Sequence, residues 1–265
     1  MKLGCFLVLA TSACLAGETA RPADTFMYLP PRIADRVVFY HSFEKGLQQA
    51  EINSIGAKIS AVELPPAKGL TGNGCQTGSI AGGKKGSFRL QSPALGVSKP
   101  LTVMFWWRLD EPMKEETSFN VVMVSGNKGY ISNFVHGKGE WCALKEPTYC
   151  FQVWNFPGIE NHNDVWGGRV WIEPRAWHHA AMTLSGACEI RLHWDGRLRT
   201  LHAPKGRAFH EGETGAIELG SGGQQPAMTL DEVIVLDRAL STEEIQAYVL
   251  AVQRLAERGA EWNRR

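Results

Sequence analysis

Three histidines are the residues whose spacing first suggests chemistry. The segment WHHAAMTLSGACEIRLHWDGRL, residues 177–198, holds His178, His179 and His193. Imidazole is the commonest metal ligand and a general base near neutral pH. However, WHHAAMTL has the composition of a strand, and neighbouring residues of a strand point to opposite faces. His178 and His179 therefore should not hold one metal ion together, and His193 is expected on the solvated polar face of the next strand.

Asp231 is the strongest single acidic candidate. It lies in LDEVIVL, which is apolar on both sides of the two acids, so its carboxylate should be at least partly buried. A buried carboxylate needs a cation or several hydrogen-bond donors, so pairing with an arginine and capping a turn are both open. Its neighbour Glu232 should face the other way along a regular strand, and the two are not expected to form an acid pair.

The region from residue 130 to residue 177 is rich in tryptophan, tyrosine and phenylalanine. Within it, FPGIENHNDVWGG is expected to be a loop that offers four polar residues beside a tryptophan: Asn161, His162, Asn163, Asp164 and Trp166. A sugar presents apolar ring faces edged by hydroxyls, which such a set complements. The alternative is that the tryptophans fill a core and the polar residues solvate a turn.

The N-terminus predicts export. Lys2, an apolar run and small residues make residues 1–16 a signal peptide with a cut after Ala16. A second interpretation is a lipoprotein, because Thr11-Ser12-Ala13-Cys14 loosely resembles a lipid-attachment box. The chain would then be secreted, periplasmic or held in the cell envelope by Cys14. No later run approaches the roughly 18 apolar residues of a membrane span.

The expected export affects how the cysteines are interpreted. Four cysteines lie beyond the signal peptide, and an even count in an oxidising compartment favours disulfides. Cys142 and Cys150 close a short loop, which leaves Cys75 to pair with Cys188. A zinc site is the alternative, but no C-x-x-C spacing supports it.

Alternating and β-branched patterns predict strands for most of the chain. LTVMFWWRL has bulky residues on both faces, as expected of a strand deep inside a sandwich. Asp195-Gly196 predicts a two-residue hairpin turn. Ser241-Thr242-Glu243-Glu244 is a capping box before a long amphipathic helix. We expect an arm or linker over residues 17–34, one domain over 35–258 that includes this helix, and a tail over 259–265.

Composition excludes several functions. The chain has 265 residues with a formal net charge of +1, and its basic residues do not cluster, so nucleic acid is not an expected partner. No Gly-x-Ser-x-Gly, His-Glu-x-x-His or phosphate-binding glycine loop occurs.

Four separated segments between residues 37 and 250 together resemble the LamG-like domains of the concanavalin A-like lectin/glucanase superfamily. They are VVFYHSFEKG, LTVMFWWRLDEP, RAWHHAAMTLSGACEIRLHWDGRL and IELGSGGQQPAMTLDEVIVLDRALSTEEI. The resemblance implies an all-β fold: a two-sheet antiparallel jelly-roll sandwich with a C-terminal α-helix.

The resemblance also implies candidate sites. In similar domains the aspartate at the position of Asp231 often helps to hold calcium, here with Glu44 and Ser42. Laminarinase-like relatives carry a Glu-x-Asp-x-x-Glu strand, and lyase-like relatives a Gln-x-His strand; neither is present.

Because fold does not choose function, three roles stay open. The first is a non-catalytic recognition module for a glycan or an extracellular protein. The second is a glycoside hydrolase or lyase of the same fold with an unfamiliar acid pair. The third is a structural or protein-interaction module of the cell envelope.

Overall fold

The computed structural model describes most of the chain beyond the predicted signal peptide. The described residues are 29–61, 64–79, 85–95, 99–112, 118–125, 130–136, 148–154, 162–169, 172–185, 189–202, 215–221 and 226–262. The predicted signal peptide, its lipid-anchor alternative at Cys14 and most of the predicted arm therefore lie outside the described residues.

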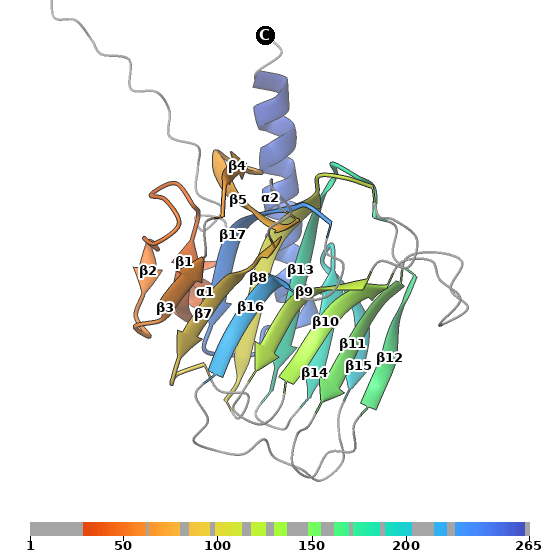
Figure 1. The fold of residues 1–265 in the computed structure, drawn as a ribbon. Coiled ribbons are helices and arrows are strands. Elements are labelled where there is room, and N and C mark those ends of the chain that lie inside the picture. The colour runs from red at the N-terminus through yellow and green to blue at the C-terminus, as the bar shows by residue number, and fades with distance from the viewer. Residues whose placement is uncertain are drawn as a thin grey trace, which may run out of the picture.

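Two antiparallel sheets face each other in the described residues (Figure 1). The ten-stranded sheet has the central order β15-β14-β13-β8-β17-β1-β2, with β4, β5 and β6 attached beside β17. Its strands are β1 (Val37–His41), β2 (Ile52–Asn53), β4 (Pro66–Lys68), β5 (Asn73–Ser79), β6 (Lys85–Gly86), β8 (Leu101–Leu109), β13 (Trp177–Leu184), β14 (Ile190–Trp194), β15 (Arg197–His202) and β17 (Met228–Leu236).

The seven-stranded sheet has the order β12-β11-β10-β9-β16-β7-β3. Its strands are β3 (Lys58–Ala61), β7 (Phe88–Ser92), β9 (Ser118–Ser125), β10 (Tyr130–His136), β11 (Thr148–Trp154), β12 (His162–Arg169) and β16 (Gly215–Ser221). Two helices complete the fold of the described residues: α1 (Pro31–Ala34), inside the predicted arm, and α2 (Thr242–Trp262). The expected all-β sandwich with a C-terminal helix is confirmed.

The main core lies between the sheets, and β8 shows how the sequence builds it. Phe105 and Trp107 point inward and are fully buried, whereas Met104 and Trp106 point to the outer face and are also buried. The bulk on both faces of LTVMFWWRL therefore serves two separate packing layers.

Helix α2 supplies the second layer by covering the outer face of the ten-stranded sheet. It begins with the expected capping box: Ser241 Oγ accepts a hydrogen bond from Glu244 N, and Glu244 Oε2 accepts one from Ser241 N. The helix then buries an apolar stripe against the outer face of the sheet: Ile245, Tyr248, Val249 and Val252. No helix in the described residues is long and apolar enough to cross a membrane.

The position of α2 corrects the prediction for His193. The outer face was expected to be solvated, but His193 is fully buried there, and its Nε2 lies 3.1 Å from Thr242 Oγ1 of α2. Burial lowers the pKa of His193 to about 4. The strand pattern cannot show this, because it contains no information about which face the helix covers.

His178 and His179 lie in β13 and point to opposite faces, as expected. The His178 ring packs against Trp107 and Trp194 in the main core, whereas the His179 ring contacts Trp106 and Tyr248 under α2. Burial is the main cause that lowers the pKa of His179 to about 3.

The expected hairpin turn at Asp195-Gly196 has positive φ at both residues, 49° and 75°. Asp195 also ties this turn to β13. Its Oδ2 lies 2.9 Å from His178 Nδ1, and its Oδ1 accepts a hydrogen bond of 2.8 Å from the backbone N–H of His179. Both carboxylate oxygens of Asp195 are therefore engaged inside the fold.

The buried neutral His179 predicts loss of stability in acid. Its pKa is lowered in the folded state, so this contribution is intact above the ordinary histidine pKa of 6.5 and falls as the pH drops toward about 3. We expect each such imidazole to add about 1.4 kcal/mol per pH unit to the slope of unfolding free energy. His179→Phe should reduce that slope between pH 6.5 and pH 4.5, measured by urea unfolding.

Tyr248→Phe is the matched control, because it changes the ring that contacts His179 and leaves the imidazole in place. Its pH slope should equal that of the parent chain. An unchanged slope in His179→Phe would contradict the assignment.

Candidate functional site

Asp231 and Glu232 lie at an irregularity in β17. The pairing register between β17 and β8 shifts between Asp231 and Ile234, and Glu232 has a φ of 53°. Such a bulge breaks the alternation of side chains along a strand. The prediction that the two acids face opposite ways is therefore wrong.

Both acids bind the same residue, Thr71. Asp231 Oδ2 accepts hydrogen bonds from the backbone N–H groups of Leu70 (2.7 Å) and Thr71 (3.1 Å). Glu232 Oε1 accepts the Thr71 hydroxyl at 3.0 Å, and its Oε2 accepts the Tyr40 hydroxyl at 2.8 Å. The acids thus fasten the turn at residues 69–73 to the sheet.

The Asp231 and Glu232 carboxyl groups are buried, and this burial is the main influence on the pKa of Asp231. Asp231 and Glu232 are 0% and 1% exposed. Burial, then the nearby Glu232 charge, raises the pKa of Asp231 well above its ordinary value, against the lowering effect of three backbone N–H donors. The expected burial of Asp231 is confirmed, and the turn-capping alternative describes its contacts.

Glu44 holds the other end of the same turn. Its Oε1 accepts the backbone N–H of Asn73 at 2.5 Å, and its Oε2 accepts Asn73 Nδ2–H at 3.1 Å. At the Asp231 end, Gly69 lets the turn lie close to the carboxylate, because a Cβ at this position would be 2.5 Å from Asp231 Oδ2. We name residues 69–73, together with Asp231, Glu232 and Glu44, the turn clamp.

The turn clamp bears on the calcium prediction. Backbone N–H groups point at the Asp231 oxygens that calcium would use, and the Ser42 hydroxyl donates to Glu51. This donor arrangement fits a capped turn better than a cation. Among the described residues, no group of three or more histidine, cysteine, aspartate or glutamate side chains could hold a metal ion.

The predicted polar loop is wrong in its backbone. Residues His162–Arg169 form β12, the edge strand of the seven-stranded sheet, where Trp166 pairs with Cys150 of β11. The segment forms a strand because its backbone can pair with the free edge of β11. His162, Asn163, Asp164 and Trp166 therefore all lie within this strand. Asn161 and the orientation of these side chains lie outside what the structure describes.

The predicted Cys75–Cys188 disulfide is also wrong at its first cysteine. Cys75 is a free thiol and fully buried in β5, and burial raises its pKa. It packs in the core between the sheets, where a small apolar side chain is well accommodated. Cys142 and Cys188 lie outside the described residues, so the Cys142–Cys150 bridge stays a prediction.

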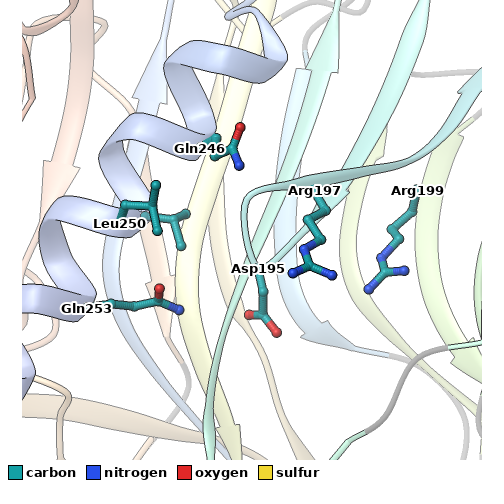
Figure 2. A pocket seen from close by; sticks show the side chains of 7 residues that line it. Asp195, Arg197, Arg199, Gln246, Leu250 and Gln253 are labelled. Carbon is teal, nitrogen blue, oxygen red and sulfur yellow. The ribbon is translucent and has the colours of Figure 1, made fainter.

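A cavity that the sequence did not suggest lies between α2 and the β14–β15 hairpin (Figure 2). It has a volume of about 300 Å³, and we name it the hairpin pocket. Its lining residues are Asp195, Arg197, Arg199, Gln246, Val249, Leu250 and Gln253.

The hairpin pocket combines hydrogen-bond donors with apolar groups. Two guanidinium groups and two side-chain amides supply hydrogen-bond donors, and Val249 and Leu250 add an apolar wall. Asp195 is the one carboxylate among the lining residues, so the pocket lacks the acid pair of a glycosidase. The sequence signal that could have found the pocket is Arg197-x-Arg199 after the turn.

The pocket lies on the same edge of the sandwich as the predicted aromatic segment. Strands β12 and β15 are the end strands of their two sheets, and they contact each other. The structure thus brings the segment around Trp166 near the strand that carries Arg197 and Arg199, although 31 residues separate Trp166 from Arg197 in the sequence.

The turn clamp predicts unequal effects of its two anchors. Asp231→Ala would leave buried backbone N–H groups without acceptors, and we expect it to lower the free energy of unfolding by about 3 kcal/mol. Glu44→Ala removes bonds at an exposed position and should cost less than about 1 kcal/mol. Urea unfolding at neutral pH measures both, and equal losses would contradict the clamp.

The comparisons with solved structures find the same fold at low sequence identity. Domain 4 of AbnA, an extracellular GH43 arabinanase from Geobacillus stearothermophilus solved with arabinotriose, is 13% identical with a TM-score of 0.58, covering 81% of this chain and 98% of that one.

Two toxin binding domains are also similar. That of Paraclostridial Mosquitocidal Protein 1 is 15% identical with a TM-score of 0.59 and covers 81% of this chain. That of Botulinum Neurotoxin DC, in complex with SialylT, is 11% identical with a TM-score of 0.61 and covers 83%. The chain spans about half of each toxin domain, 52% in both cases.

A comparison with curated proteins finds no significant match. A family model described as the concanavalin A-like lectin/glucanases superfamily matches residues 82–246, more than half of the chain. The matched residues run from the core strands to the first turn of α2, and they include the β14–β15 hairpin. The chain therefore belongs to the concanavalin A-like lectin/glucanase superfamily.

Proposed function

We propose that this protein is an exported, non-catalytic recognition module that binds a glycan. The observation that carries the proposal is the hairpin pocket, whose donor groups and apolar wall occur together in one cavity. Its volume lies at the lower end of the usual range for small-ligand sites. One or two sugar units of a longer chain would suit such a cavity.

The comparisons support a binding role without assigning a ligand. The similar arabinanase domain was solved with arabinotriose, and another similar toxin domain is described as interacting with ganglioside. A further Botulinum Neurotoxin DC structure contains rat synaptotagmin II, which favours a protein partner as the second candidate. Fold similarity at this identity cannot choose between the two.

Export belongs to the same proposal. The N-terminal apolar run supports removal of a signal peptide after Ala16 or lipid attachment at Cys14. The mature chain would then meet glycans in the cell envelope or outside the cell. Calcium at Asp231 and Glu44 remains part of the proposal as a factor to be tested.

A glycan array with the mature chain tests the proposal. We expect binding to at least one class of oligosaccharide, and the array is repeated with calcium and with a chelator. Loss of binding in chelator would support the calcium prediction, and unchanged binding would remove it. Absence of binding to every glycan would overturn the proposed function and favour the protein partner.

Two variants locate the binding surface. Gln246→Ala with Gln253→Ala removes two polar groups of the hairpin pocket, and we expect affinity for the array hit to fall about tenfold, measured by calorimetry. Gln49→Ala is the matched control, because this exposed residue lies just before β2, at the opposite edge of the ten-stranded sheet. Loss of binding in Trp166→Ala alone would place the surface on β12 instead.

A further inference from the structure

The arginines of the hairpin pocket differ from most arginines of the described residues. Several arginines elsewhere pair with carboxylates: Arg36 with Asp237, Arg89 with Glu218, Arg108 with Asp110, Arg191 with Glu189, and Arg238 with Glu244. Arg197 and Arg199 make no ion pair within the described part of the chain. No carboxylate of the described residues therefore neutralises their positive charges.

Asp195 does not neutralise them, although it lines the same pocket. Its two oxygens are engaged by the His178 ring and by the backbone N–H of His179. Figure 2 shows both arginine side chains extending from β15 in the same direction, with Asp195 beside Arg197. The pocket thus presents two guanidinium groups together, and its formal charge is positive.

Arg199 also has a buried atom without a partner, as do Arg191 and Arg238, whose guanidinium groups nonetheless pair with carboxylates. The Nε atom of Arg199 is buried and has no hydrogen-bond partner among the described residues. A buried donor without an acceptor costs free energy in the folded state, and such a group needs an explanation such as a bound ion or water. A bound anion would satisfy the guanidinium group directly or by drawing it into a new position.

We propose that the hairpin pocket is an anion site that selects acidic glycans through Arg197 and Arg199. The ligand group is a carboxylate or a sulfate carried on a sugar ring. A guanidinium group binds such oxyanions through two parallel hydrogen bonds, which gives orientation as well as attraction. Gln246 and Gln253 bind neighbouring hydroxyls, and Leu250 contacts the apolar face of the ring. The inference rests on the proposed glycan binding and narrows its substrate class.

The test measures calorimetric affinity for three oligosaccharides of equal length: a uronic acid chain, a sulfated chain and a neutral chain. The parent protein should bind at least one acidic chain tenfold or more tightly than the neutral chain. The acidic chain that binds identifies the group as carboxylate or sulfate. Binding should weaken as salt increases, because the attraction is partly electrostatic.

Variants separate the effect of the planar, two-bond geometry of the guanidinium group from the effect of its charge. Arg197→Gln with Arg199→Gln should abolish the preference for the acidic chain, so that the acidic and neutral chains bind this variant with affinities within about twofold of each other. Arg197→Lys with Arg199→Lys keeps the charge without the planar fork and should retain only part of the preference. Lys45→Gln with Lys58→Gln makes the same change in net charge at exposed positions near the opposite edge of the sandwich, and it should bind as the parent does.

The outcomes distinguish the two proposals. Equal affinity for acidic and neutral chains, or an acidic preference that survives the double glutamine variant, overturns the anion site and leaves glycan binding intact. If none of the three oligosaccharides binds and the glycan array gives no hits, the proposed function is overturned. Urea unfolding confirms that each variant is folded, which is expected because Arg197 is exposed and Arg199 is half-buried.

Discussion

The fold depends on burying both faces of the central strands in the ten-stranded sheet. Strands β8, β13 and β17 pack their inner side chains against the seven-stranded sheet and their outer side chains against α2. Burial of apolar surface on this scale is the main favourable term in folding. The helix is therefore part of the core, and the pocket lies where α2 meets the β14–β15 hairpin (Figure 2).

Polar groups inside these layers are accommodated in two ways. The Asp231 and Glu232 carboxylates are buried, and each of their oxygens accepts a hydrogen bond. His179 is buried among aromatic rings, and neither ring nitrogen has a partner in the described residues. The acids therefore fasten a turn to the sheet, whereas the imidazole stays neutral and makes the layer under α2 sensitive to acid.

The hairpin pocket differs from both cases because, among the described residues, its guanidinium groups have no ion-pair partner. Its carboxylate is used internally by β13. One similar domain was solved with arabinotriose and another with rat synaptotagmin II. A superfamily fold supplies the rigid frame, and the choice of ligand depends on a few side chains at its edges.

Sequence periodicity and turn chemistry were enough to predict many of the strands, the Asp195-Gly196 hairpin and the capped helix, whereas the two-sheet sandwich was implied by the resemblance of four segments to a known superfamily. The strands, the hairpin and the helix depend on local residue patterns, which repeat with the period of the element that they build. Opposite placement of His178 and His179 followed from the same periodicity.

Tertiary structure decided the remaining features, because they depend on which distant segments meet. The bulge at Glu232 turned two acids toward Thr71, pairing with β11 made a strand of residues 162–169, and α2 buried His193. Arg197 and Arg199 stand out only once α2 closes one side of their pocket and the Asp195 carboxylate that lines it is engaged by His178 and His179. No local pattern records those long-range choices, so the candidate site emerged from the fold.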